Sequence, residues 1–264
     1  MGGGHAAATR RANHSFARGE TDMVGGAVWS ADIAVPEHDR EQAFYASVLT
    51  TGGSPRWQAD LLNNEGTPII GLGPRSDEYD FLPLQWMPHI QVTDVGASVT
   101  AARDSGAEEL MHSRTDDGQS QWAVLKDPEG AAFGLIPLVP DQQPPADNVG
   151  RICWLSRPAA DTNAMAAFYQ QVAGWNLRPV GGGSSVTEIE LQTSDGATIG
   201  AIVANTAELP TVWMIHLPVG DLAASLGQVR DGGGAVLQES GTPVRRAIVR
   251  DPVGACFALQ EDVG

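Results

Sequence analysis

Two segments of this chain occur twice, in the same order. Residues 86–94 (WMPHIQVTD) return as residues 213–221 (WMIHLPVGD), and the same offset matches further residues as far as Leu110 and Leu237. Residues 123–135 return as residues 247–259, each time around the motif Asp-Pro-x-Gly-Ala-x-Phe. A weaker match joins residues 36–45 to residues 158–169, which both end in Ala-Phe-Tyr. Segments repeated in order indicate repeated structural units, so the sequence predicts a duplicated domain.

The composition is that of a globular protein with an acidic surface. The 264 residues are 42% hydrophobic and 18% charged, which suits two small domains that each bury a core. Acidic residues outnumber basic ones 32 to 16, for a formal charge of −16. This charge repels phosphate backbones and anionic lipid surfaces, so we expect neither a nucleic-acid partner nor a membrane partner.

The N-terminal residues 1–24 predict a disordered extension. Arg10 and Arg11 are not followed by an apolar stretch, as a secretory signal requires, and Met23 is an alternative start. No segment reaches the roughly 20 apolar residues of a membrane span. The two cysteines, Cys153 and Cys256, provide no disulfide framework. We therefore expect a cytoplasmic monomer or homodimer.

The sequence pattern predicts a unit of one strand, one helix and three strands. This unit occurs four times along the chain, twice in each half. In the first half we expect strands at 28–35, 57–62, 68–73, 86–92, 123–126 and 131–136, and helices at 36–49 and 95–105. Asp94 is the expected N-cap of the second helix and Gly106 its end. Residues 137–149, rich in proline, predict a linker between domains at 25–136 and 150–264.

The Ala-Phe-Tyr helix, the Trp-x-x-His strand and the Asp-Pro-x-Gly-Ala-x-Phe strand resemble those of the vicinal oxygen chelate superfamily. That superfamily includes glyoxalases, extradiol dioxygenases and bleomycin-resistance proteins. The resemblance implies an α+β fold of four βαβββ units, which pair into two cup-shaped domains. It covers roughly residues 28–261 and is nearest to tandem, metal-poor glyoxalase-like proteins. Because the fold hosts many reactions, the resemblance predicts the fold more strongly than the function.

The same resemblance places metal ligands at fixed positions on the first and last strands of each unit. In this chain those positions are held by side chains that are poor ligands for a divalent metal: Ser30, Met87, Gly134, Trp154, Met214 and Ala258. We therefore expect no metal and no other cofactor.

Strand alternation places a different polar set on the cup faces. In the first cup we expect Asp32 and His89 as catalytic residues, because a carboxylate beside an imidazole performs acid–base chemistry. The other residues that we expect to bind substrate are Ser30, Met87, Gln91, Trp154, Ser156, Met214 and His216. The alternative for both histidines is a structural role within the sheet. Arg245 and Arg246 could meet an anionic ligand, although a solvated turn explains them better. Glu188 and Glu190 share one strand face and could do acid–base work, but an edge or solvent-facing strand explains them as well.

Two functions follow from these patterns. The first is a metal-independent enzyme of lyase, isomerase or cyclase type that acts on a small, partly hydrophobic metabolite. The asymmetry of Asp32, which is replaced by Ser156 in the second half, favours it. The second is a protein that binds or sequesters a small molecule without catalysis, as in drug resistance. Both have a small-molecule ligand as the partner.

Overall fold

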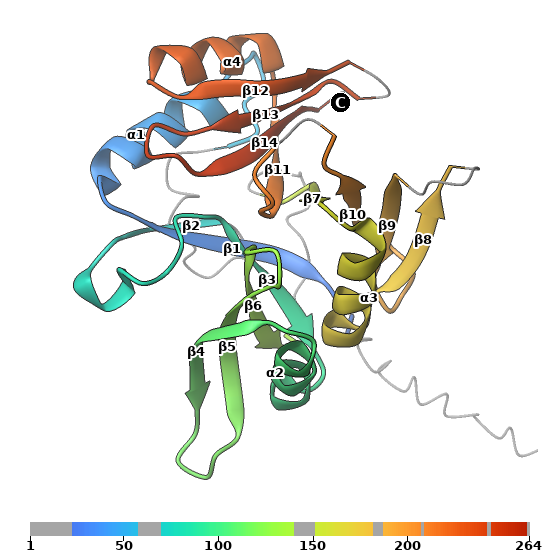
Figure 1. The fold of residues 1–264 in the computed structure, drawn as a ribbon. Helices are drawn as coiled ribbons and strands as arrows, with labels where there is room; N and C mark the ends of the chain where they lie inside the picture. Colours follow the sequence, from blue (N-terminus) through green and yellow to red (C-terminus); the bar gives the residue numbers. More distant parts are fainter. Residues whose placement is uncertain are drawn as a thin grey trace, which may run out of the picture.

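The protein forms two β-sheets, one from each half of the chain (Figure 1). The structure is a computed structural model that describes residues 23–57, 70–139, 151–181, 187–206, 209–241 and 244–262. The two sheets and four α-helices among these residues agree with the predicted α+β class of paired glyoxalase-fold cups. The predicted extension and linker lie almost entirely outside the described residues.

The first half contains six described strands and two α-helices. They are β1 (Val28–Val35), α1 (His38–Leu49), β2 (Ile70–Pro74), β3 (Met87–Val92), α2 (Val95–Asp104), β4 (Glu108–Arg114), β5 (Ser120–Lys126) and β6 (Ala132–Pro137). A short 3-10 helix, η2 (Asp77–Tyr79), follows β2. The strand predicted at 57–62 falls mostly outside the described residues.

The second half contains eight described strands and two α-helices. They are β7 (Trp154–Ala159), α3 (Thr162–Ala173), β8 (Asn176–Val180), β9 (Glu188–Gln192), β10 (Thr198–Ala204), β11 (Met214–Val219), α4 (Leu222–Asp231), β12 (Ala235–Ser240), β13 (Arg246–Arg250) and β14 (Cys256–Glu261). β8 and β9 extend one edge of the second sheet and have no counterpart among the described strands of the first.

Strand pairing repeats between the halves. The first sheet has the order β2-β1-β3-β6-β5-β4, and the second has β12-β13-β14-β11-β7-β10-β9-β8. In the first sheet β1 runs antiparallel to β3, and β3 runs parallel to β6. In the second sheet β7 runs antiparallel to β11, and β11 runs parallel to β14. The predicted duplication is therefore present in the topology as well as in the sequence.

Three edge strands were not located from the sequence. β4, β8 and β12 lie at the ends of their sheets, where one side of the strand has no neighbouring strand among the described residues. Their residues are partly or fully exposed on both faces and do not alternate clearly between polar and apolar. The period-two signal of a half-buried strand is therefore absent.

The helices pack across the boundary between the halves. α1 contacts α4, and α2 contacts α3 (Figure 1). In the core, the Trp86 indole donates to the Tyr45 hydroxyl at 3.0 Å, and Tyr45 donates to Asp251 of the other half at 2.9 Å. The equivalent Trp213 donates to Tyr169, and Tyr169 donates to Asp127. The repeated motifs therefore hold the two halves together.

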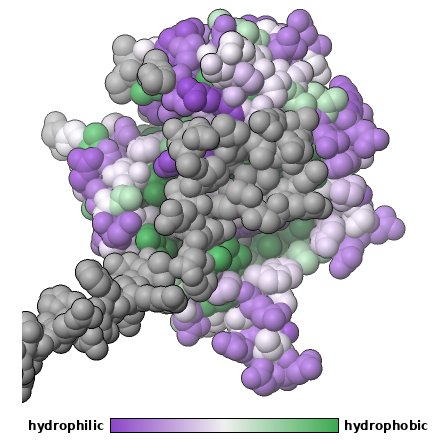
Figure 2. Space-filling view, turned by 180° about the vertical axis from the view of Figure 1, so that it is seen from behind, coloured by the Kyte–Doolittle hydropathy of each residue, from purple (hydrophilic) through white to green (hydrophobic). Residues whose placement is uncertain are grey.

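Hydrophilic and apolar side chains occupy different parts of one molecular face. On the face shown in Figure 2, hydrophilic side chains occupy the outer rims, and apolar side chains come to the surface nearer the centre. No helix among the described residues is both long enough and apolar enough to cross a membrane.

Candidate functional site

The first cup is the cavity on one face of the first sheet. It has a volume of about 650 Å³. Its lining includes polar and small residues from β1 and its neighbours, and a wall of large apolar side chains. The lining residues are Asp32, Ile33, Ala34, Gly73, Pro74, Ser76, Tyr79, Leu82, Met87, His89, Met111, Trp122, Ala123, Val124, Gly134 and Ile136.

Asp32 and His89 meet at the floor of this cup. His89 Nε2 lies 3.3 Å from Asp32 Oδ2, and His89 Nδ1 lies 2.9 Å from Ser30 Oγ. The imidazole is therefore held at both ring nitrogens. The Asp32 side chain is 47% exposed and that of His89 is 18% exposed, so the carboxylate is the group presented to the cavity.

The sheet register brings these side chains together. Asp32 pairs with Met87 across the antiparallel β1–β3 contact, which places it beside His89 two residues further along β3. His89 pairs with Gly134 across the parallel β3–β6 contact. A Cβ atom on Gly134 would lie 2.9 Å from His89 Cδ2, closer than side-chain carbons approach. The glycine therefore makes room for the imidazole.

The walls of the first cup are apolar. Met87 and Met111 come from β3 and β4, Tyr79 from η2, and Trp122 from β5. Trp122 is one of the few large hydrophobic residues that remain exposed, at 39% of its surface. Aromatic and methionine side chains around a small polar floor are typical of a site for a partly hydrophobic ligand.

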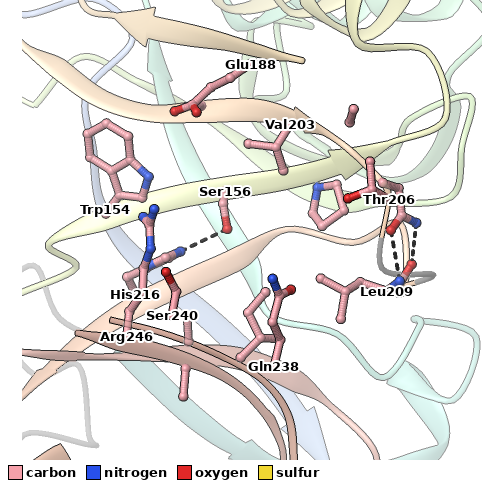
Figure 3. Close-up of a pocket in the computed structure, with 17 residues that line it drawn as sticks. Trp154, Ser156, Glu188, Val203, Thr206, Leu209, His216, Gln238, Ser240 and Arg246 are labelled. Carbon is pink, nitrogen blue, oxygen red and sulfur yellow. Dashed lines mark hydrogen bonds between the residues drawn. The ribbon is translucent and has the colours of Figure 1, made fainter. Parts of the chain in front are cut away.

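The second cup is the corresponding cavity of the second sheet, with a volume of about 230 Å³. Ser156 Oγ lies 2.9 Å from His216 Nε2, and both residues are buried (Figure 3). Burial, followed by the charge of Arg246, lowers the pKa of His216 to about 3, although the interaction with the Gln260 side chain opposes this shift. The His216 imidazole is therefore neutral at physiological pH.

The expected binding residues are distributed unevenly over the two cups. Met87 lines the first cup, whereas Trp154, Ser156 and His216 line the second. Ser30 reaches the first cup through its hydrogen bond to His89.

Gln91 and Met214 line neither cavity. Gln91 is buried, and its Oε1 accepts a hydrogen bond from the backbone of Val139. Met214 is fully buried in the sheet.

Sequence reasoning missed several lining residues. Met111 lies on an edge strand that was not predicted, and Tyr79 lies on a short 3-10 helix. Arg246, first assigned to a solvated turn, is the first residue of β13 and lines the second cup, as Glu188 does. Arg246 and Ile248 are two residues apart on β13, so their side chains lie on the same face of the strand, and both line this cavity. This spacing is the sequence signal that could have identified Arg246.

The side chains at the family's ligand positions do not fit a divalent metal. In the first cup they are a hydroxyl, a thioether and a glycine, and the glycine's space is occupied by the His89 ring. Among the described residues, no group of three or more His, Cys, Asp or Glu side chains is arranged to hold a metal ion. The Asp32 carboxylate and the His89 imidazole instead contact each other.

The two cysteines do not provide a nucleophile. Burial raises the pKa of the Cys153 thiol to about 12 and that of the Cys256 thiol to about 11. Both thiols stay protonated at neutral pH, and neither lines one of the two cups. The titratable residues of interest are therefore the carboxylates and histidines on the sheets.

Comparisons with known proteins agree with the duplicated fold. A family model described as a glyoxalase-like domain matches twice, over residues 30–136 and 154–260. The anthracycline biosynthesis protein DauV of Streptomyces sp. (strain C5) is 28% identical over 199 residues, which is 72% of this chain and 70% of DauV.

Solved structures of two enzymes share the fold at low sequence identity. The Mn(II)-bound glyoxalase from Novosphingobium aromaticivorans has a TM-score of 0.52 and 13% identity, over 91% of this chain and 84% of that chain. The 2,2',3-trihydroxybiphenyl 1,2-dioxygenase from Sphingomonas wittichii strain RW1 has a TM-score of 0.52 and 14% identity, over 91% of each chain. At this identity they support the fold alone.

Proposed function

Because this chain belongs to the glyoxalase-like domain family, with one domain in each half, we propose that it is an enzyme acting on a small molecule in its first cup. The reaction is a proton transfer of lyase, isomerase or cyclase type. The observation that carries the proposal is the Asp32–His89–Ser30 arrangement at the floor of an apolar cavity.

Asp32 is the proposed general base. Its carboxylate is the more exposed member of the pair and faces the cavity. A Ser30 hydroxyl that donates to His89 Nδ1 leaves the ring proton on Nε2, which then points at Asp32. His89 thereby orients the carboxylate. It also stabilises the negative charge until Asp32 removes a proton from substrate carbon and later returns it.

The proposed reaction does not use a metal. The side chains at the ligand positions do not fit one, and the catalytic pair contains its own proton donor and acceptor. An enzyme of this kind needs a substrate whose proton is already acidic, such as one next to a carbonyl group, because there is no Lewis acid to activate it.

The substrate class follows from the wall of the cup. Tyr79, Met111 and Trp122 suit a molecule with an apolar or aromatic body. The name of DauV connects that relative with anthracycline biosynthesis, which supports a role for this chain in making a secondary metabolite.

A binding or sequestering protein is the second candidate. The observation that favours it is the lining of the first cup, where large apolar side chains surround the Asp32–His89 pair and few other polar groups, and the two members of that pair contact each other. Such a cavity retains a hydrophobic ligand without needing to react with it.

The two candidates are separated by Asp32→Asn. The protein is incubated in D2O with a metabolite extract from its source cells, and each metabolite is followed by mass spectrometry for conversion or deuterium uptake. We expect the wild type to change one metabolite and Asp32→Asn to slow this by about two to four orders of magnitude, since an amide cannot take up the proton. Binding of the same metabolite stays nearly unchanged.

The control is His216→Gln, in the second cup, which should keep most of the activity. Full turnover by Asp32→Asn would contradict the enzyme. A metabolite that the wild type binds but never changes would leave the binding protein as the function.

A further inference from the structure

The second cup carries two opposite charges on opposite walls. Arg246 comes from β13 and Glu188 from β9, and four strands of the sheet, β14, β11, β7 and β10, separate them. Neither side chain forms a salt bridge with another described residue, although both are partly buried in the cavity. Figure 3 shows Glu188 on one side of the cavity and Arg246 reaching in from the other.

We propose that the second cup is a separate binding site for a small zwitterion, whose carboxylate meets Arg246, whose ammonium group meets Glu188 and whose planar body lies against Trp154. This inference does not rest on the proposed function of the first cup. It assigns a ligand class to a cavity that the Asp32–His89 chemistry does not use.

Arg246 provides the anion-binding end. The neighbouring His216 stays neutral because it is buried and because Arg246 repels a second positive charge. The guanidinium is therefore the only full positive charge among the described residues that line this cup. Arg246 has no carboxylate partner among the described residues, so its partly buried guanidinium is stabilised when a ligand brings one, and its planar fork matches a carboxylate.

Glu188 sets the other end of the ligand. The Glu188 carboxylate repels a ligand that carries only negative charge. A ligand that places a positive group or a hydrogen-bond donor beside Glu188 avoids this repulsion. The separation of the charges across the cup therefore selects a molecule with one charge at each end, instead of an anion or a cation alone.

Trp154 supplies the surface between the two ends. Its indole lines the cavity beside Ser156, and Arg246 extends from β13 toward it (Figure 3). Val203 and Ile248 add apolar surface to the same cavity. A cavity of about 230 Å³ with one aromatic wall suits a ligand built on a single ring.

The duplicated positions show that the two cups have diverged. The repeat aligns Arg246 with Trp122 and Gln238 with Met111, so the second cup is charged and polar where the first is apolar. It also aligns Trp154 with Ser30, which binds His89 in the first cup. Cups that differ at all three positions cannot share one ligand class.

The test uses a zwitterion and three probes that lack its positive group, its negative group or both. They are para-(aminomethyl)benzoate, para-methylbenzoate, benzylamine and para-methylbenzamide, and binding to the full-length protein is measured by calorimetry and by ligand-observed NMR. We expect the zwitterion to bind most tightly. Arg246→Gln should weaken it roughly tenfold or more, and Arg246→Lys should weaken it less because the charge is kept.

Glu188→Gln gives the sharper result. It should weaken the zwitterion while strengthening para-methylbenzoate, and this opposite change for two probes cannot come from a misfolded variant. Asp32→Asn, in the first cup, is the matched control and should leave all four affinities unchanged.

Three results would overturn the proposal. The first is no preference of the wild type for the zwitterion over the neutral amide. The second is unchanged zwitterion binding in Arg246→Gln. The third is loss of binding in Asp32→Asn, which would place the probe in the first cup.

Discussion

At the scale of single residues, the two halves keep one histidine and change what surrounds it. His89 contacts Asp32 and Ser30, whereas the equivalent His216 contacts Ser156 and lies near Arg246. A shared histidine is thus a feature of the fold, and its neighbours decide its chemistry. The first is positioned beside a carboxylate, and the second is buried and neutral.

Gly134→Ala should disturb the first histidine alone. The new methyl group would lie 2.9 Å from His89 Cδ2, so the ring must move away from Ser30 and Asp32. In histidine-ring NMR spectra we expect the chemical shifts of the His89 ring to change, while those of His216 stay in place. The control is Ala258→Gly, at the equivalent position beside His216. Unchanged His89 signals in Gly134→Ala would contradict the close contact.

At the scale of elements, the repeated motif builds the same helix start twice. Asp94 accepts a hydrogen bond from the backbone of Ala97 at 2.9 Å, and Asp221 accepts one from Ala224 at 2.9 Å. These side chains satisfy N–H groups that otherwise have no partner within the helix. α1 differs, because Glu37 at its N-cap position makes no such bond.

Asp94→Ala and Asp221→Ala should each lower the free energy of unfolding by about 1 kcal/mol, since each leaves a helix N-terminus uncapped. Denaturant unfolding, followed by circular dichroism, measures this loss. Glu37→Ala is the matched control and should cost much less, because no capping bond is removed. An equal loss in all three variants would show that capping is not the cause.

At the scale of the whole molecule, the junction between the halves is symmetric in its aromatic residues but not in its charges. Asp127 is paired with the buried Arg157, whose Nη2 lies 2.9 Å from Asp127 Oδ2. Within the part of the chain that the structure describes, the equivalent Asp251 has no such cation, and Glu41, a second buried carboxyl, lies nearby. Burial, followed by the charge of Asp251, raises the pKa of Glu41 to about 7.

This raised pKa predicts how stability changes with pH. An unfolded Glu41 has a pKa near 4.5. Between about pH 4.5 and 7, the folded state therefore holds a proton on Glu41 that the unfolded state has lost. The stabilisation of the fold by this proton is complete below pH 4.5 and is lost as pH rises to 7. His216 acts in the opposite direction. Its pKa is lowered in the folded state, so the free energy of unfolding decreases as pH falls below 6.5. The contribution of Glu41 is therefore measured as the difference in stability between the wild type and a Glu41 variant at each pH.

Glu41→Gln, which mimics the protonated carboxyl, should gain stability relative to the wild type as pH rises from 4.5 to 7, by up to about 1.4 kcal/mol per pH unit. Denaturant unfolding at several pH values gives this difference. A flat difference for Glu41→Gln would mean that Glu41 is ionised in the folded protein.

The sequence by itself determined the duplication, the order of the helices and of the strands other than β4, β8 and β12, the Asp94 cap and the cup-facing parity of Asp32 and His89. All of these depend on local periodicity or on direct comparison of the halves, so they can be found without coordinates. The proton-transfer role of Asp32 and His89 remains a prediction.

Only the tertiary structure decided which side chains share a cavity and what charge they carry. Gln91 and Met214 have the expected parity, yet packing against other segments removes them from the cups. Arg246 and Glu188 are far apart in the sequence and face one cavity because the sheet curves. The neutral state of His216 and the raised pKa of Glu41 arise from burial, a property of the whole fold that no single segment encodes.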